Sequence, residues 1–122
     1  MSVEASDAIV VFITAASDEE ATRLAEILVK TDLAACVQIL PSIQSVYRWK
    51  GKLERQSEVL LVAKTLRSRF EALDGEVRAI HSYEVPEIVA VPLTAISQPY
   101  LDWLVDAMGL SPETNQAADQ DV

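Results

Sequence analysis

The chain has 122 residues, half of them apolar, with a formal net charge of −9 and a pI of about 4.4. This length suits a single domain with one hydrophobic core. The ten Lys and Arg residues are spread along an acidic sequence without the basic cluster that nucleic-acid binding requires. No apolar run reaches the ~18 residues of a membrane span. We therefore expect neither nucleic acid nor membrane as a partner.

Cys36 is the only cysteine, so the chain can form no internal disulfide. The first residues lack the basic and apolar segments of a secretory signal, and we expect a cytoplasmic protein. Residues 1–7 are polar and expected to be flexible, and residues 111–122 are polar, acidic and expected to be disordered. One folded domain is predicted over residues 8–110.

The first two predicted elements are a strand and a helix. Residues 8–13 form a continuous apolar run rich in β-branched side chains, which is typical of a strand buried on both faces. Ser17 and Glu20 are spaced as in a capping box, in which each side chain satisfies a backbone N–H group at a helix start. Apolar residues then recur at helical spacing, which predicts a helix over residues 17–32.

A long β-hairpin is predicted next. Residues 35–49 have the composition of an extended segment, and Pro41 within it indicates a bulge or an edge because proline cannot donate to a ladder. Residues 50–52, Lys-Gly-Lys, are typical of a tight turn, and the second strand follows over residues 53–65. Apolar side chains on this strand alternate onto both faces, so both faces need burial.

A second helix is predicted over residues 67–80, a strand over residues 87–93 and a last helix that begins near Pro99. The order strand, helix, strand, strand, helix, strand is the split βαβ pattern. We therefore predict an α+β, ferredoxin-like sandwich with a long β-hairpin and an extra C-terminal helix. Because two helices cover only one apolar face of the sheet, we also expect subunits to associate through their sheets.

Polar chemistry concentrates in residues 81–87, His-Ser-Tyr-Glu-Val-Pro-Glu. Imidazole and carboxylate groups are suitable ligands for Cu(II) and similar cations, so His81 and Glu84 are candidate metal ligands. A structural alternative stays open, in which His81 ends the preceding helix and the acidic side chains are solvated or form ion pairs. The sequence has no glycine-rich phosphate loop and no Cys-x-x-Cys motif, and its single histidine limits acid–base catalysis.

Four segments resemble the signature segments of the CutA family of divalent-cation tolerance proteins: residues 33–37 (LAACV), 45–53 (SVYRWKGKL), 81–88 (HSYEVPEI) and 100–104 (YLDWL). The resemblance extends over roughly residues 8–107. It implies a homotrimer of ferredoxin-like subunits whose sheets pack edge to edge, with clefts between subunits like those of PII-type signalling proteins. It also implies a role in tolerance of divalent cations, copper above all.

The same resemblance implies which side chains line the cleft. The polar positions are Cys36, Lys64, His81, Tyr83 and Glu84, and the aromatic neighbours are Tyr47, Trp49 and Trp103. Two positions at which copper-associated members of the family carry Cys and His hold Ile13 and Ile80 in this chain. From the residues alone, Cys36 is more often a small buried hydrophobe, and packing is the favoured role of the aromatic side chains.

We therefore predict a trimeric divalent-cation tolerance protein, not an enzyme, that binds copper or another divalent cation in clefts between subunits. The first alternative is a PII-like sensor of a small-molecule effector, and an anionic effector would require Lys64 and Arg48 to face the cleft. An enzyme that uses Cys36 or His81 is a further alternative and would show perturbed pKa values in a cleft. The last alternative is a trimer that serves only as a structural scaffold.

Overall fold

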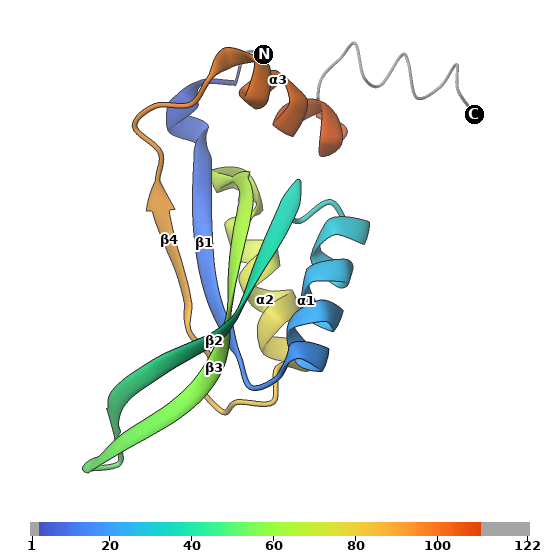
Figure 1. Cartoon of the computed structure of the whole chain (residues 1–122). Coiled ribbons are helices and arrows are strands. Elements are labelled where there is room, and N and C mark those ends of the chain that lie inside the picture. The colour runs from blue at the N-terminus through green and yellow to red at the C-terminus, as the bar shows by residue number, and fades with distance from the viewer. Residues whose placement is uncertain (1–2, 111–122) are drawn as a thin grey trace.

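The computed structural model describes residues 3–110 (Figure 1). Its main elements are β1 (Ala8–Ala15), α1 (Asp18–Lys30), β2 (Cys36–Trp49), β3 (Lys52–Leu66), α2 (Phe70–Ile80), β4 (Ile88–Pro92) and α3 (Gln98–Ala107). The strands form one antiparallel sheet in the order β2-β3-β1-β4, which confirms the predicted ferredoxin-like fold. Among the described residues, no helix is long and apolar enough to cross a membrane. The predicted disordered tail, residues 111–122, lies outside the described residues.

The main core lies between the sheet and helices α1 and α2. On β1, the alternate side chains of Ile9, Val11 and Ile13 are at most 2% exposed, as expected where one face of a strand packs on a core. Their partners in this core come from β3 and from both helices: Leu61, Ala63, Leu24, Leu28, Leu73 and Val77. The helical spacing of the last four residues explains why α1 and α2 are amphipathic and cover this face.

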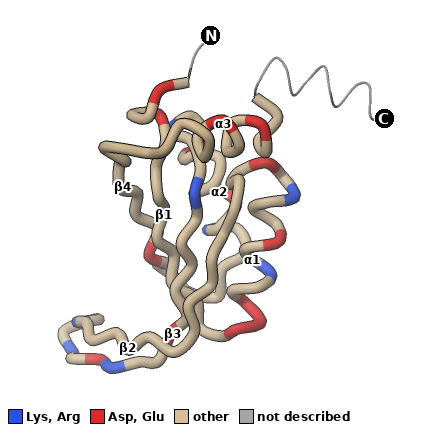
Figure 2. Tube along the Cα trace, turned by 45° about the horizontal axis from the view of Figure 1, so that its top comes forward, with Lys and Arg blue, Asp and Glu red and all other residues tan. Residues whose placement is uncertain are grey.

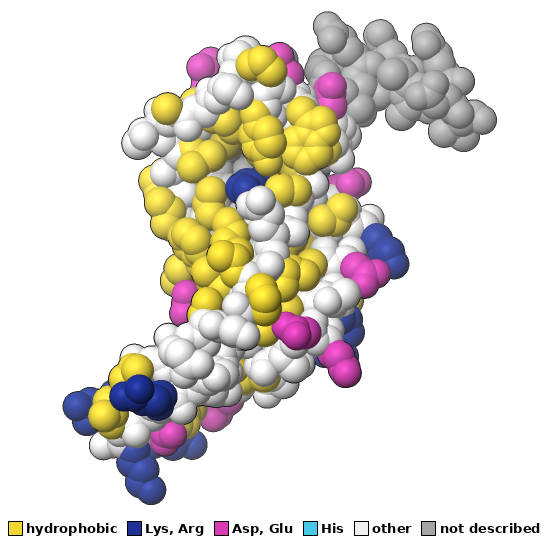
Figure 3. Space-filling model, in the orientation of Figure 1, with side chains coloured by type: hydrophobic (Ala, Val, Ile, Leu, Met, Phe, Trp, Pro, Cys, Tyr) yellow, Lys and Arg dark blue, Asp and Glu magenta, His cyan; other side chains and the backbone are white. Residues whose placement is uncertain are grey.

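The opposite face of the sheet is also apolar, and α1 and α2 do not cover it. The register places Phe12 of β1 opposite Val62 of β3 and Val89 of β4, and Val10 opposite Val91. Val89 and Val91 are 48% and 46% exposed. Figure 3 shows hydrophobic side chains gathered over the strands on this uncovered face. The two apolar faces inferred from the alternation along β3 are therefore present, and the helices bury only one of them.

The β2–β3 hairpin extends well beyond the body of the domain (Figure 1). Lys50 and Gly51 both have positive φ, 50° and 80°, and join Trp49 to Lys52 as in a two-residue type I′ turn. The register of β2 against β3 shifts between Leu40 and Ile43, so Pro41 does mark a bulge, as predicted. The bulge lies where the hairpin leaves the body.

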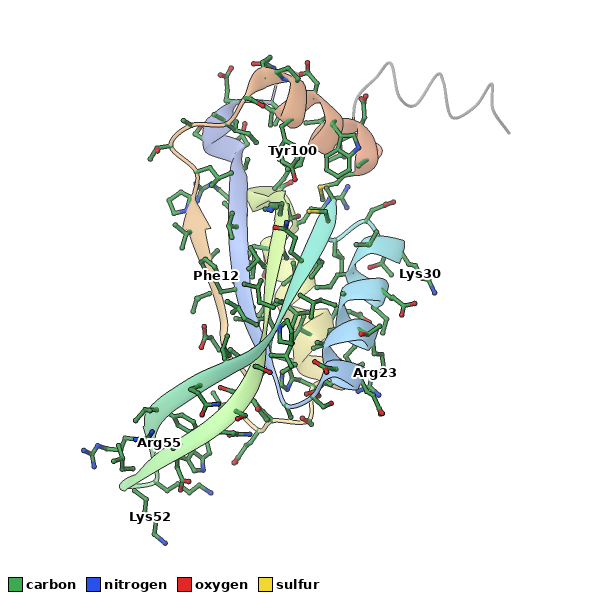
Figure 4. The ribbon with its side chains drawn as sticks, in the orientation of Figure 1. Phe12, Arg23, Lys30, Lys52, Arg55 and Tyr100 are labelled. Atoms are coloured by element: carbon green, nitrogen blue, oxygen red, sulfur yellow. The ribbon has the colours of Figure 1, made fainter. Side chains whose placement is uncertain are left out.

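Basic residues cluster around the hairpin turn, although they were expected to be spread along the chain. Arg48, Lys50, Lys52 and Arg55 lie within eight residues around the turn, and Figure 2 shows the resulting basic tip. Figure 4 shows Lys52 and Arg55 projecting from this tip, away from the body. The expectation of scattered basic residues was therefore wrong for the tip, because a turn brings near neighbours from two strands together.

Helix α3 closes the end of the domain opposite the hairpin tip (Figure 1). Its cap is Ser97, whose hydroxyl accepts a hydrogen bond from the Tyr100 backbone N–H at 3.4 Å. Its apolar face forms a second core with the ends of β1 and β3: Ala8, Leu66, Leu101, Leu104, Val105 and Met108. The extra C-terminal helix thus has its own core and does not cover the open sheet face.

Ala5–Asp7 lie inside the N-terminal segment that was expected to be flexible, but they form a 3-10 turn. The Glu4 backbone N–H donates to Asp7 Oδ2 at 2.8 Å, and Arg67 Nη2 donates to the Ser6 carbonyl at 3.1 Å. These contacts hold the chain directly before β1, and the flexibility of residues 1–7 stays a prediction.

Replacing Leu61 by alanine tests the placement of the main core. Leu61 is 0% exposed, so we expect the free energy of unfolding to fall by about 2–5 kcal/mol. Urea denaturation at a fixed chain concentration measures this change. The matched control is Leu53→Ala on the hairpin, where the leucine is 72% exposed and a change within about 0.5 kcal/mol is expected. Equal losses in the two variants would contradict this core.

Candidate functional site

A pocket of about 630 Å³ lies along the hairpin, from Glu58 at its root to Trp49 beside its turn, and is called the hairpin-root pocket below. Three parts of the fold line it: Thr14 at the end of β1, hairpin residues from both strands, and the segment 82–87 between α2 and β4. The volume is within the range of about 300–1,000 Å³ that is common for small-molecule sites. The pocket is thus lined jointly by the hairpin and by the segment that follows α2.

The pocket is acidic and aromatic. Its rings are Tyr47, Trp49 and Tyr83, and its ionisable side chains besides the tyrosines are the carboxylates of Glu58, Glu84 and Glu87. No Lys, Arg or His of the described residues is among the residues that line it. A water-accessible site with carboxylates and without basic side chains favours a positively charged ligand over an anion.

A directed chain of hydrogen bonds orders one wall of the pocket. Tyr47 Oη donates to Gln56 Oε1 at 2.6 Å, and Gln56 Nε2 donates to Tyr83 Oη at 3.2 Å. Tyr83 Oη in turn donates to Glu58 Oε2 at 2.7 Å. Burial, reinforced by the carboxylate of Glu58, raises the pKa of the Tyr83 phenol. Tyr83 therefore stays protonated at neutral pH and keeps Glu58 as its acceptor.

His81 lies behind this wall and not on the surface of the pocket. Its side chain is 0% exposed, and its ring lies 4.7 Å from the ring of Tyr83 between centroids. The Tyr83 backbone N–H donates to Nδ1 at 3.0 Å, so Nδ1 is an acceptor and the ring proton is on Nε2. Nε2 then donates to the Thr14 carbonyl at 2.7 Å. Both ring nitrogens thus hold backbone groups, and His81 positions Tyr83.

Glu20 also supports the pocket from below. Its side chain does not make the hydrogen bond that the predicted capping box requires. The Ser17 hydroxyl accepts from the Glu20 backbone N–H at 3.1 Å, as predicted. The Glu20 side chain, however, accepts from the Ala16 N–H at 3.0 Å and from the N–H and hydroxyl of Ser82 at 2.8 and 3.0 Å. It lies 3.8 Å from His81 Nδ1. The reason for the difference is a partner 62 residues away, which a local pattern cannot reveal.

The ionisation of Glu20 is shaped by these contacts. Burial alone would raise the pKa of its carboxyl, but hydrogen bonds from Ala16 and Ser82, with His81 nearby, hold the pKa below its usual value of 4.5. Glu20 is 6% exposed. It is therefore a buried carboxylate that stays ionised and ties β1, α1 and the segment after α2 together.

The structure separates the candidate site residues into two groups. Tyr47, Trp49, Tyr83 and Glu84 line the pocket. Cys36, Lys64 and Trp103 lie at the other end of the sheet, near α3: Cys36 Sγ is 3.6 Å from Tyr100 Oη, and the rings of Tyr100 and Trp103 are 5.4 Å apart. Lys64 is opposite Cys36 in the register and donates to Gln38. Figure 4 shows Tyr100 directed from α3 toward the strands. Within one chain the two groups do not form one site.

His81 and Glu84, the two predicted metal ligands, lie in different surroundings. Glu84 is 73% exposed and lies 4.0 Å from Lys50 Nζ, whereas His81 is enclosed. Among residues 3–110, no group of three or more His, Cys, Asp or Glu side chains could hold a metal ion. A complete metal centre is therefore not supplied by the described part of a single chain.

Sequence reasoning missed Glu58 and Gln56, although a signal was present. The two residues are two positions apart on β3, so they share one face of the strand. They stand directly before the apolar run that begins at Val59. The signal is weak, because charged residues often flank apolar strands, and the burial of Glu58 is visible only in the structure.

Glu20→Gln tests the support beneath the pocket. The lowered pKa means that ionised Glu20 stabilises the fold above pH 4.5, and that this contribution is lost as the pH falls through the lowered value. We expect the variant to lose about 1.5–3 kcal/mol of unfolding free energy at pH 7, typical of hydrogen bonds to a charged group. The difference from wild type should shrink at pH 3. Urea denaturation at both pH values measures it.

Glu19→Gln is the matched control, because it removes the same charge from the same turn of α1 at an exposed position. It is expected to change the free energy of unfolding by less than about 0.5 kcal/mol. A Glu20 effect that is equal to this control, or that is independent of pH, would contradict the proposed role.

The comparisons with known proteins agree with this fold. A family model described as CutA1 divalent ion tolerance protein matches residues 9–107. The chain is 46% identical to the divalent-cation tolerance protein CutA of Thermus thermophilus over 82% of this chain and 97% of that one. A crystal structure of CutA1 from Oryza sativa, 41% identical, has a TM-score of 0.81 and covers 85% of this chain and 96% of that one.

A chloroplastic protein CutA of Arabidopsis thaliana is 48% identical over 79% of this chain. The match spans only 53% of the Arabidopsis protein, so the chain covers about half the length of that relative. The family model nevertheless covers nearly all of the described domain. The chain belongs to the CutA1 divalent ion tolerance family.

Proposed function

We propose that the chain acts as a homotrimer that binds divalent cations at the hairpin-root pocket, with the carboxylates of Glu58, Glu84 and Glu87 as part of the ligand set. The observation that carries the proposal is the composition of the pocket, which holds three carboxylates and is lined by no basic side chain of the described residues. The names of the relatives, divalent-cation tolerance proteins, support the same class of ligand. We keep a cytoplasmic location as part of the proposal.

The uncovered sheet face supports assembly. Its exposed valines Val89 and Val91 lie on β4, an edge strand whose backbone is paired on one side only. β2 is the other edge strand of the same sheet. Apolar surface beside an unpaired strand is removed from water when a second copy packs on it or extends the sheet. A trimer would also place pockets near neighbouring chains, which can complete a site.

A cation at this pocket would require ligands beyond one chain. The described residues of one chain provide no cluster of three metal-binding side chains, and both nitrogens of His81 are already hydrogen-bonded. The remaining donors would be water or groups from a neighbouring chain. Carboxylate oxygens favour hard cations such as Mg²⁺ or Mn²⁺, whereas Cu(II) favours imidazole nitrogen. We therefore propose that the ligand is a divalent cation, and the titration below includes Cu²⁺ as well as Mn²⁺.

The PII-like alternative is less well supported for an anionic effector. Such an effector would need basic groups in the pocket, yet neither Lys64 nor Arg48 lines it. Lys64 lies opposite Cys36 near α3 and donates to Gln38. Arg48 belongs to the basic hairpin tip. The observation that would favour an anion is therefore absent from the described pocket.

The assembly is tested by charging the uncovered face. Wild type should sediment as three chains of 13.4 kDa, or about 40 kDa. The double variant Val89→Lys/Val91→Lys should shift toward the monomer, because lysines on this face would have to be buried in the interface. Val29→Lys is the control, since Val29 is 42% exposed on α1. Analytical ultracentrifugation measures the mass. A monomeric wild type, or an unchanged double variant, would contradict the assembly.

Cation binding is tested by titrating metal-free protein with Mn²⁺ and with Cu²⁺ in a competing chelator. We expect saturable binding that falls at least about tenfold in Glu84→Gln/Glu87→Gln, which corresponds to about 1.4 kcal/mol. The control Glu19→Gln/Glu26→Gln removes the same charge from exposed positions on α1. Binding that is unsaturable in wild type, or equal in both double variants, would sink the proposal. Preference for Mn²⁺ over Cu²⁺ would indicate an oxygen ligand set.

A further inference from the structure

We propose that the hairpin-root pocket also binds a small organic cation, an ammonium or guanidinium group carried on an apolar or aromatic body. The proposal goes beyond the binding of metal ions because it depends on the aromatic wall of the pocket. It shares Glu58 with the proposed function, and its experiment is chosen so that either can fail alone.

The first observation is a buried carboxylate without a cationic partner. Glu58 is 7% exposed and lines the pocket, and Tyr83 donates one hydrogen bond to its Oε2. Within residues 3–110, no Lys, Arg or His forms an ion pair with it. A buried charge is costly unless an opposite charge compensates it. A positively charged ligand in the pocket would supply this compensation.

The second observation is the aromatic wall. Tyr47, Trp49 and Tyr83 line the same pocket as Glu58. The faces of such rings attract ammonium and guanidinium groups, which lie within about 6 Å of the ring centroid. A volume of about 630 Å³ is also far larger than a metal ion needs. The combination of ring faces, a carboxylate and this volume fits an organic cation.

The third observation is that the protein's own ammonium group already occupies the rim. Lys50 Nζ lies 5.6 Å from the centroid of the Trp49 ring and 4.0 Å from Glu84 Oε2. Trp49 and Glu84 both line the pocket. The side chains of Lys50 and Glu84 are each 73% exposed, so this contact exchanges readily with solvent. Lys50 thus shows how an ammonium is held between ring and carboxylate, and it competes with a ligand for that place.

The test uses the full chain and a matched pair of probes, phenethylammonium and its neutral counterpart 2-phenylethanol. The two share the same aromatic body and differ in charge. Isothermal titration and ligand-observed NMR should show saturable binding of the amine, with the alcohol at least about tenfold weaker. Equal binding of both probes, or no saturable binding of the amine, would overturn the proposal.

Variants then assign the contacts. Trp49→Leu should weaken amine binding about tenfold, whereas Trp103→Leu, on α3 and outside the pocket, should leave it unchanged. Lys50→Met should strengthen amine binding about threefold, because it removes the competing ammonium from an exposed position. Weaker or unchanged binding in Lys50→Met would overturn the proposal, even if Trp49→Leu proved to be unstable.

Mn²⁺ titration of the same variants separates the two proposals. A metal ion uses carboxylate oxygens and not the ring, so Trp49→Leu should bind Mn²⁺ like wild type while losing the amine. Amine binding without saturable Mn²⁺ binding would leave the organic-cation site standing and remove the proposed metal function. Mn²⁺ binding without amine binding would leave the proposed metal function standing and remove the organic-cation site.

Discussion

The fold depends on a sheet whose two central strands are apolar on both faces. Ile13 of β1 lies opposite Leu61 of β3 on the helix side, while Phe12 lies opposite Val62 on the other side. A strand has period two, so helices on one face cannot bury the other set of side chains. Two helices stabilise the domain through the first set, and the second set remains as surface that favours association. The apolar surface on which the proposed trimer depends is thus a property of the strands themselves.

The position of the pocket depends on a polar support below that sheet. Thr14 is the next-to-last residue of β1, Glu20 lies in the first turn of α1, and His81 follows the last residue of α2. Hydrogen bonds join Thr14 to His81, Glu20 to Ser82, and His81 to the backbone N–H of Tyr83. Because these groups are buried, loss of one partner would leave another unsatisfied. Tyr83 is therefore held by the body of the domain, and the hairpin brings Glu58 to it.

Much of the fold could be predicted from the sequence because it is determined by local patterns. The apolar period of α1, the Pro41 bulge and the hairpin turn all depend on residues within one element, and the structure contains each of them. Their physical causes act over a few residues, so the sequence alone is enough to identify them.

The site was less predictable because its contacts join distant segments. His81 resembles a metal ligand in isolation, but its ring nitrogens meet Thr14, 67 residues away, and Tyr83. Cys36 and Lys64 are placed near α3 by the strand register, far from Tyr47 on the same hairpin. This separation could have been predicted, because the predicted hairpin puts Cys36 and Lys64 at its open end and Tyr47 beside its turn. The contact between Glu20 and Ser82, in contrast, could not be predicted, because the two residues are 62 positions apart in the sequence.

The charged side chains around the hairpin-root pocket do not form a close ion pair. Where this chain pairs charges for structure, as between Arg78 and Asp74 on α2, nitrogen and oxygen are 3.1 Å apart. Lys50 instead lies at the rim, 4.0 Å from Glu84. Glu58 is 7% exposed and forms no ion pair among the described residues, whereas the glutamate beside Lys50 is the exposed Glu84. A buried carboxylate without an opposite charge is costly for stability, and this cost is the physical basis of the proposal that a cation enters the pocket.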